Sequence, residues 1–301
     1  MRSLFIILST LMFTTFNLQA SSLSTGPGCY QYTDSVTGKT LNVWYYKPEN
    51  FNPKTPVLFV MHGMSRDAVG YRNSWVEHAK SGNYMLLTPE FSEANFPDDQ
   101  HYNWGNYIQP DGTVNPREKW NYLIVERIFD DFIQSRETTD ARQYYIYGLS
   151  AGSQFVQRFM LLVPEARAKL AICANAGFYT VLDPGESWPC GLKGTGVDQA
   201  AVLRYLSLPL VILLGDKDID PDDPQLPTGE DADRQGITRL ARGVYFFNHG
   251  QAAARKFKVP FGWQIRMVPG APHGGPIIHA GGAQVLLEAL AARDKTANGR
   301  Q

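Results

Sequence analysis

The sequence predicts an α/β fold with one mostly parallel central sheet and helices on both of its faces. Short apolar runs rich in β-branched and aromatic residues alternate with segments of helical pattern, as in parallel strands joined by crossover helices. The clearest strand candidates are residues 57–61, 84–88, 144–147, 169–174, 208–214 and 263–268. Polar motifs follow several of these runs directly, and the functional loops of such sheets lie at the carboxyl ends of the strands.

The composition fits one large globular domain. The chain has 301 residues, of which 44% are hydrophobic and 19% charged, and its formal net charge is −1. This balance gives no electrostatic reason to expect a nucleic-acid partner. No apolar run inside the body of the chain reaches the length of a membrane span. We expect a single domain over residues 40–301, preceded by an N-terminal extension over residues 21–39.

Residues 1–20 have the pattern of a secretory signal peptide. Arg2 precedes a short apolar core, and Ala20 offers a small residue at the expected cleavage point. An uncleaved membrane anchor is the alternative, and the shortness of the apolar core argues against it. We therefore expect a secreted or periplasmic protein with no membrane contact after signal removal. No Asn-x-Ser/Thr sequence is present, which favours a bacterial source.

The chain has three cysteines. An oxidising compartment makes a disulfide plausible, and an odd number leaves one thiol over. Cys173 and Cys190 flank a loop rich in glycine and proline, so we expect them to be bridged. Cys29, near the mature N-terminus, is then the free thiol.

The first half of the chain reads as an edge strand, a buried strand and a long irregular connection. Residues 40–46 alternate in polarity, and residues 57–61 form a continuous apolar run that ends in His62-Gly63-Met64. A helix is expected over residues 68–80. Residues 89–116 are irregular and aromatic, and the apolar positions that recur every four residues predict an amphipathic helix over 117–135.

The centre of the chain carries a Gly-x-Ser-x-Gly motif. Residues 148–152 read Gly-Leu-Ser-Ala-Gly, between a strand of aromatic and β-branched residues and a helix expected over 153–163. This strand–turn–helix context is the one in which such a serine is strained, exposed and nucleophilic. We expect Ser150 to be the nucleophile.

The second half of the chain supplies the partners that a nucleophilic serine needs. A second irregular segment covers residues 175–206, and the next strand ends in Gly215-Asp216-Lys217-Asp218. The last strand leads into Pro272-His273, and a closing helix is expected over 277–292. The order Ser150, Asp218, His273 is that of a hydrolase triad, with His273 as base and Asp218 as orienting acid.

Two features of this assignment have alternatives. Asp216 and Asp220 follow the same strand as Asp218, which we prefer because the chain has turned into the loop by that residue. Alternate aspartates over residues 216–222 also resemble a calcium loop, but proline stands where its glycine and glutamate belong, so we expect no metal.

An acyl transfer also needs donors for the developing oxyanion. The backbone N–H of Ala151, the residue after the nucleophile, is one candidate, and that of Met64, after the His62-Gly63 turn, is the other. We interpret His62 itself as a structural residue that holds this turn.

These motifs resemble the α/β-hydrolase superfamily, in its esterase branch near polyhydroxybutyrate-depolymerase-like and dienelactone-hydrolase-like proteins. The resemblance covers about residues 40–292 and rests on the segments 62–64, 148–152, 215–218 and 272–274. It implies an α/β-hydrolase fold, a Ser-His-Asp triad and no cofactor. Many relatives have histidine where Leu149 stands, at a position outside the triad.

The resemblance and the loops together predict a carboxylic-ester hydrolase for short-chain or polymeric esters. Aromatic residues in the two irregular segments are expected to contact the substrate; they are Tyr107, Phe178, Tyr179 and Trp188. A serine peptidase of the same fold and a catalytically silent binding protein are the alternatives. The natural ester and the oligomeric state stay open at this point.

Overall fold

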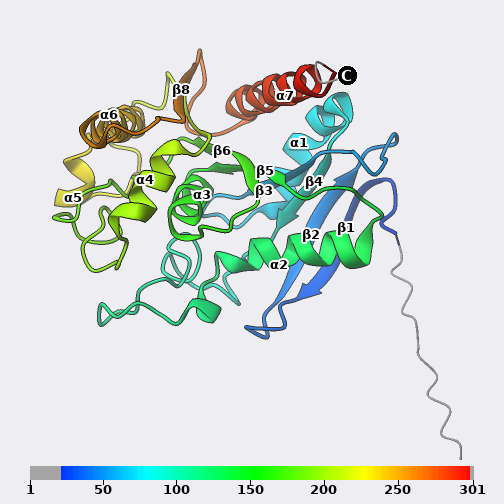
Figure 1. Cartoon of the computed structure of the whole chain (residues 1–301), viewed down its shortest axis with the longest axis horizontal. Helices are drawn as coiled ribbons and strands as arrows, with labels where there is room; N and C mark the ends of the chain where they lie inside the picture. Colours follow the sequence, from blue (N-terminus) through cyan, green and yellow to red (C-terminus); the bar gives the residue numbers. More distant parts are fainter. Residues whose placement is uncertain (1–21, 299–301) are drawn as a thin grey trace, which may run out of the picture.

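The computed structural model describes residues 22–298, and the predicted signal peptide, residues 1–20, lies outside the described residues. The chain forms an eight-stranded sheet with the order β1-β2-β4-β3-β5-β6-β7-β8 (Figure 1). The strands are β1 (Gly26–Thr33), β2 (Thr40–Lys47), β3 (Val57–Met61), β4 (Met85–Pro89), β5 (Tyr144–Leu149), β6 (Ala168–Ala174), β7 (Leu210–Gly215) and β8 (Trp263–Val268). From β4 to β8 all neighbours are parallel, whereas β1–β2 and β2–β4 are antiparallel. The predicted mostly parallel sheet is confirmed.

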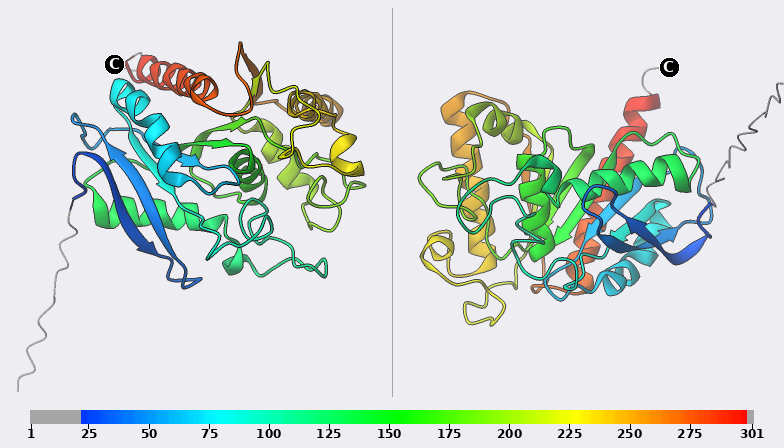
Figure 2. Two further views of the ribbon diagram at one scale, coloured as in Figure 1. Left: turned by 180° about the vertical axis from the view of Figure 1, so that it is seen from behind. Right: turned by 90° about the horizontal axis from the view of Figure 1, so that it is seen from below.

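Helices cover both faces of the sheet and divide the interior into two cores. The helices are α1 (Ala68–Gly82), α2 (Leu123–Asp131), α3 (Ala151–Leu162), α4 (Gln199–Ser207), α5 (Glu230–Asp233), α6 (Arg239–Phe257) and α7 (Pro276–Asn298). Helices α1 and α7 pack on one face, around Trp75 and Leu286. Helices α2, α3, α4 and α6 contribute to the other core, and Figure 2 shows the two layers. Within the described part of the chain, no helix combines the length and apolarity needed to cross a membrane.

Two elements differ from their predictions. Residues 21–39, expected to be an extension, contain β1, which adds an outer strand beside β2 over the full length of residues 26–33. The helix predicted over 117–135 is divided into a 3₁₀ turn (η1, Arg117–Lys119), α2 and a π turn (η2, Phe132–Arg136). The break has a cause in the preceding loop, because Asn121 donates from its backbone N–H to Gly105 and from its side chain to His101.

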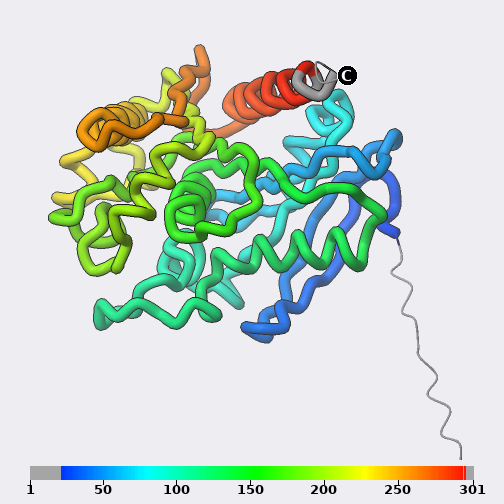
Figure 3. The backbone as a smooth tube through the Cα atoms, in the orientation of Figure 1, coloured from blue at the N-terminus to red at the C-terminus, as the bar shows by residue number. Residues whose placement is uncertain are grey.

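The two long irregular segments contact each other beside α3. The Tyr107 hydroxyl donates to the Thr195 carbonyl at 2.5 Å, and the rings of Tyr107 and Trp188 are 5.3 Å apart. Arg158, a fully buried residue of α3, donates to the carbonyls of both segments, at Asn103 and Pro189. Figure 3 traces the two segments on the same side of the molecule.

The predicted bridge between Cys173 and Cys190 is wrong. All three cysteines, in the part of the chain that the structure describes, are free thiols. Cys173 lies in β6 within the larger core, whereas Cys190 packs against Phe178 and Ala232 in a separate small cluster. Proximity in sequence does not set the Cβ–Cβ distance and direction that a disulfide requires.

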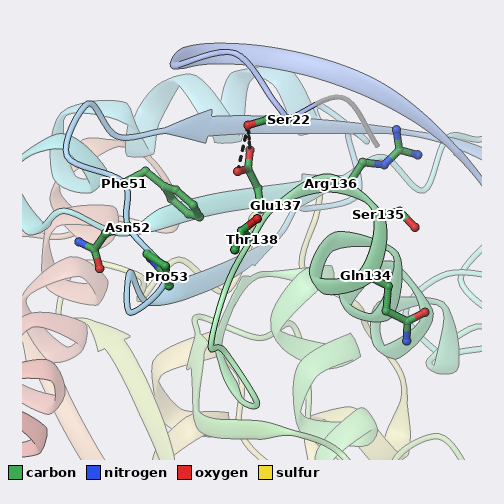
Figure 4. Close-up of a pocket in the computed structure, with 9 residues that line it drawn as sticks. All are labelled: Ser22, Phe51, Asn52, Pro53, Gln134, Ser135, Arg136, Glu137 and Thr138. Atoms are coloured by element: carbon green, nitrogen blue, oxygen red, sulfur yellow. Dashed lines mark hydrogen bonds between the residues drawn. The ribbon is translucent and has the colours of Figure 1, made fainter. Parts of the chain in front are cut away.

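The start of the described chain is held by a buried ion pair. The Lys47 Nζ lies 2.7 Å from the Glu137 carboxylate, and their side chains are 11% and 4% exposed. Glu137 also accepts from the Ser22 hydroxyl and the Leu23 backbone N–H. Ser22 and Glu137 also border a cavity of about 360 Å³ (Figure 4), to which no residue of the candidate triad contributes.

Candidate active site

Ser150 occupies the sharp turn between β5 and α3. Its backbone has φ 57° and ψ −118°, a conformation that non-glycine residues adopt rarely and that is typical of strained functional sites. A Cβ on Gly148 would lie 2.2 Å from the Gly152 carbonyl oxygen, and one on Gly152 would lie 2.2 Å from the Met61 carbonyl oxygen. Both glycines are therefore needed for the chain to turn this tightly over the end of β3.

The imidazole of His273 connects Ser150 to Asp218. Its Nε2 lies 3.1 Å from the Ser150 Oγ, and its Nδ1 lies 2.9 Å from Asp218 Oδ2. With its proton on Nδ1, the neutral ring donates to Asp218 and accepts from the serine hydroxyl. Asp218 is only 3% exposed, so the carboxylate acts on the ring with little screening by water. This series can take a proton from the serine as the serine attacks.

The other two aspartates considered for the acid have different partners. Asp216 Oδ1 accepts from the Gly270 backbone N–H at 2.7 Å, and Asp220 Oδ1 accepts from the Asp222 N–H at 2.9 Å. Of the three, only Asp218 contacts His273. Within residues 22–298, no group of three or more His, Cys, Asp or Glu side chains is arranged to hold a metal ion.

Asn175 is a site residue that the sequence analysis missed. It follows β6 directly, is fully buried and has φ 43°. Its Nδ2 donates to the carbonyl of His273 at 2.9 Å and to that of Pro272 at 3.2 Å, while its Oδ1 accepts from the Gly215 N–H at 2.9 Å. Asn175 thus ties the His273 loop to the end of β7. The only signal in the sequence was a buried strand ending in asparagine, a residue that tolerates positive φ.

The turn after β3 brings Gly63, the residue before Met64, beside the elbow. Gly63 lies beside Ser150, because a Cβ built on it would be 3.8 Å from the Ser150 Cβ and 2.8 Å from the Tyr71 hydroxyl. Ala151 is the first residue of α3, so its N–H is one of the unpaired donors at a helix N-terminus. The Met64 side chain is 45% exposed.

His62 is buried behind this turn. Its Nδ1 lies 2.9 Å from the Gly63 carbonyl, and its Nε2 accepts from the Phe91 N–H at 3.0 Å. Burial lowers the pKa of His62 to about 4, so the ring is neutral near pH 7. The Tyr102 hydroxyl donates to the His62 carbonyl, and the two rings stack at 4.7 Å. The His62 side chain therefore connects the turn after β3 to the loop after β4.

The four aromatic residues expected to contact substrate are mostly enclosed. Tyr179 is fully buried and stacks on Phe246 at 4.5 Å, so its ring is part of the core. Tyr107 is 4% and Phe178 7% exposed, and Phe178 lies under the Arg158 guanidinium. Trp188 alone among the four is only half-buried.

No protein-family model matches the sequence, and no curated protein sequence matches it. Solved structures do match. Poly(aspartic acid) hydrolase-1 from Sphingomonas sp. KT-1 is 38% identical, with a TM-score of 0.84 over 87% of this chain and 98% of that chain. LpqC, a poly(3-hydroxybutyrate) depolymerase from Bordetella parapertussis, is 33% identical, with a TM-score of 0.81 over 88% of each chain.

A more distant likeness concerns the fold alone. An S-formylglutathione hydrolase from Agrobacterium tumefaciens is 19% identical, with a TM-score of 0.57 over 88% of this chain and 95% of that chain.

The two relatives above 30% identity show the family to which this chain belongs, in agreement with the sheet order and the serine turn. The chain belongs to the α/β-hydrolase superfamily, in the esterase-type branch that includes poly(aspartic acid) hydrolase-1 and LpqC.

Proposed function

We propose that the protein is a serine hydrolase that cleaves carboxylic esters through an acyl-enzyme, with Ser150 as nucleophile, His273 as base and Asp218 as orienting acid. The observation that carries this proposal is the hydrogen-bonded series from Ser150 to His273 to Asp218, at a strained turn above β5. The names of the two relatives above 30% identity, a depolymerase of a polyester and a hydrolase of poly(aspartic acid), support hydrolytic chemistry.

In the acylation step the Ser150 Oγ attacks the ester carbonyl carbon. His273 Nε2 takes the hydroxyl proton, and Asp218 stabilises the imidazolium that forms. The carbonyl oxygen gains the negative charge, and we propose the backbone N–H groups of Ala151 and Met64 as the donors that stabilise it. Collapse of the tetrahedral intermediate breaks the bond to the alkoxy group, and His273 gives its proton to the departing alcohol.

In deacylation water repeats the same steps. His273 takes a proton from water, the hydroxide attacks the acyl carbon, and the proton returns to the Ser150 oxygen as the acid leaves. No cofactor takes part in either step. Asn175 and His62 act on the geometry of the site, because the first holds the His273 loop and the second holds the oxyanion turn.

We propose short-chain or polymeric esters as the substrates. Three exposed large apolar residues lie on or directly after the loops that carry the site, and they are Met64, Ile219 and, at the start of α7, Ile277, at 45%, 51% and 46% exposure. Exposed apolar groups around a reactive serine favour contact with an apolar ester chain at the surface. Of the aromatic residues, we propose Trp188 for substrate contact. The predicted signal peptide would bring the enzyme to such substrates outside the cytoplasm.

A second candidate is hydrolysis of an amide-linked polymer. It is favoured by one observation, the 38% identity to a protein named for poly(aspartic acid). The two candidates separate in a single comparison of purified protein on poly(3-hydroxybutyrate), nitrophenyl esters and poly(aspartic acid). Ester turnover without cleavage of poly(aspartic acid) supports the first candidate.

The proposal is tested by labelling with a fluorophosphonate. The wild-type protein should be labelled and should lose nitrophenyl-acetate hydrolysis, whereas Ser150→Ala should show neither labelling nor activity above a small residual. Ser153→Ala is the matched control, because Ser153 lies on the next turn of α3 and is fully buried. A folded Ser150→Ala protein that keeps most of its activity would contradict the proposal.

A further inference from the structure

We propose that Arg239 and Asp223 tune the proton affinity of His273 through Asp218, with Arg239 lowering it and Asp223 raising it. Both act as positioning residues that set the pH at which the site becomes active. The proposal deepens the proposed function and rests on His273 being its general base.

The series of charges continues beyond the candidate triad. Asp218 presents Oδ2 to His273 at 2.9 Å, and its other oxygen, Oδ1, lies 3.4 Å from Arg239 Nη1. The same Nη1 lies 2.6 Å from Asp223 Oδ2. Asp218 and Asp223 therefore share the guanidinium of Arg239. Whenever the His273 ring is protonated, the Asp218 carboxylate contacts two cations, the imidazolium and the guanidinium.

Burial strengthens the electrostatic interactions among Asp218, Arg239 and Asp223. The Arg239 and Asp218 side chains are 1% and 3% exposed, and that of Asp223 is 21% exposed. The Nε and Nη2 of Arg239 are buried without a hydrogen-bond partner, so the ion pairs run through one nitrogen. Charges in such surroundings interact more strongly than charges in water.

The backbone holds the arrangement in place. Arg239 is the first residue of α6, and the Thr238 side chain caps that helix by accepting from the Ala241 N–H. The next N–H, of Leu240, donates to the Asp218 carbonyl at 3.2 Å. The start of α6 is thus bonded to the Asp218 backbone, which fixes the guanidinium relative to the carboxylate.

The sign of each effect follows from charge. Asp218 stabilises the His273 imidazolium, and the Arg239 cation at the other carboxylate oxygen offsets part of that stabilisation. Asp223 neutralises part of the Arg239 charge and adds a negative charge, so it acts in the opposite direction. The coupling is mutual, because Arg239 first, and also the charge of His273, hold the pKa of the Asp223 carboxyl below its usual range.

Other charged or titratable groups near the site do not interrupt this series. From the strand side, Asp216 is bound by the Gly270 N–H and Lys217 is exposed. From α6, Arg242 pairs with Asp233 at 2.8 Å. From the other packing elements come Tyr179, Tyr71 and His279; burial raises the pKa of both tyrosines and lowers that of His279 to about 4, so all three are neutral near pH 7.

The test is the pH profile of kcat/KM for nitrophenyl acetate in Arg239→Met and Asp223→Asn. The acidic limb should move to higher pH by about half a unit to one unit in Arg239→Met, and to lower pH by a smaller amount in Asp223→Asn. Arg239→Lys, which keeps the charge, should remain close to the wild type. Asp222→Asn removes an exposed charge from the same loop and should leave the limb unchanged.

A purely structural role would lower kcat in both variants without moving their limbs in opposite directions. Limbs that do not move, or that move in the same direction, would therefore overturn the proposal. If Arg239→Met fails to fold, the downward shift in Asp223→Asn decides alone, since Asp223 is partly exposed. An NMR titration of the His273 ring, assigned with His273→Gln, reads the same shifts without activity. If the wild type hydrolysed no ester but the NMR titrations of the two variants showed the expected shifts, only the proposed function would be refuted.

Discussion

Replacement of Asn175 by alanine should destabilise the fold and slow the reaction together. The substitution removes the two hydrogen bonds that Nδ2 donates to the His273 loop and leaves the Gly215 N–H buried without an acceptor. An unsatisfied buried donor costs about 1–3 kcal/mol, and each lost hydrogen bond about 1 kcal/mol. Alanine at φ 43° adds about 1 kcal/mol of backbone strain.

The sum predicts a loss of about 4–6 kcal/mol in the free energy of unfolding. Because the loop that carries His273 loses its anchor, kcat should fall by about ten- to a hundredfold, whereas KM should change little. Urea unfolding measures the first quantity and steady-state hydrolysis of nitrophenyl acetate the second.

Two control variants separate the causes. Asn175→Gly keeps the loss of hydrogen bonds but relieves the strain. Asn83→Ala tests the same substitution at φ 47° at the end of α1, where the residue contacts neither triad loop. Asn83→Ala should lower stability without changing kcat. If Asn175→Ala retained wild-type kcat while losing stability, the residue would be a structural asparagine with no part in placing His273.

Three further predictions follow from the site and the core. Asp218→Asn should lower kcat by several orders of magnitude, whereas Asp220→Asn should have a small effect, and the reverse order would contradict the assignment of the acid. Since burial lowers the pKa of His62 and His279 to about 4, both are protonated more easily in the unfolded chain. The stability that each neutral histidine contributes should therefore be complete above about pH 6.5, and the free energy of unfolding should fall by about 3 kcal/mol per histidine between pH 6.5 and 4. Urea unfolding at several pH values measures this fall, and a His279→Phe variant whose stability falls with pH as steeply as the wild type would exclude the contribution of His279. The thiols of Cys173 and Cys190 should react with an alkylating reagent once the protein is unfolded, without any reducing agent. Thiols that react in the unfolded protein only after a reducing agent is added would indicate a disulfide.

The sequence was sufficient to predict the parallel sheet because its buried strands are continuous apolar runs. Residues 57–61 and 144–147 read as strands without ambiguity, since both faces of each strand are covered. The β1 strand was missed because Gly26 to Gly28 resembles a turn, and its pairing with β2 depends on a partner rather than on its own pattern. The break before α2 was missed for a similar reason, because it is set by hydrogen bonds from the preceding loop.

The candidate site shows the same division. The positions of Ser150, Asp218 and His273 were readable because each follows a strand and glycine or proline marks the turn. Asn175 and Arg239 make side-chain contacts with segments that are distant in the sequence, and no local pattern predicts such contacts. The cysteine pairing failed because nearness in the chain was used in place of geometry, and Tyr179 faces the core although its loop lies beside α3.

The most direct test of the central claim is an acid-quenched reaction with nitrophenyl acetate, followed by mass mapping of the digested protein. An acyl-enzyme should appear as one acetyl group on the peptide that contains Ser150, with its amount rising in the first turnover and falling as substrate is consumed. The acetyl group should accumulate in His273→Gln only slowly and should be absent from Ser150→Ala. Steady hydrolysis with no acetyl group at Ser150, or with the group on another residue, would contradict the account.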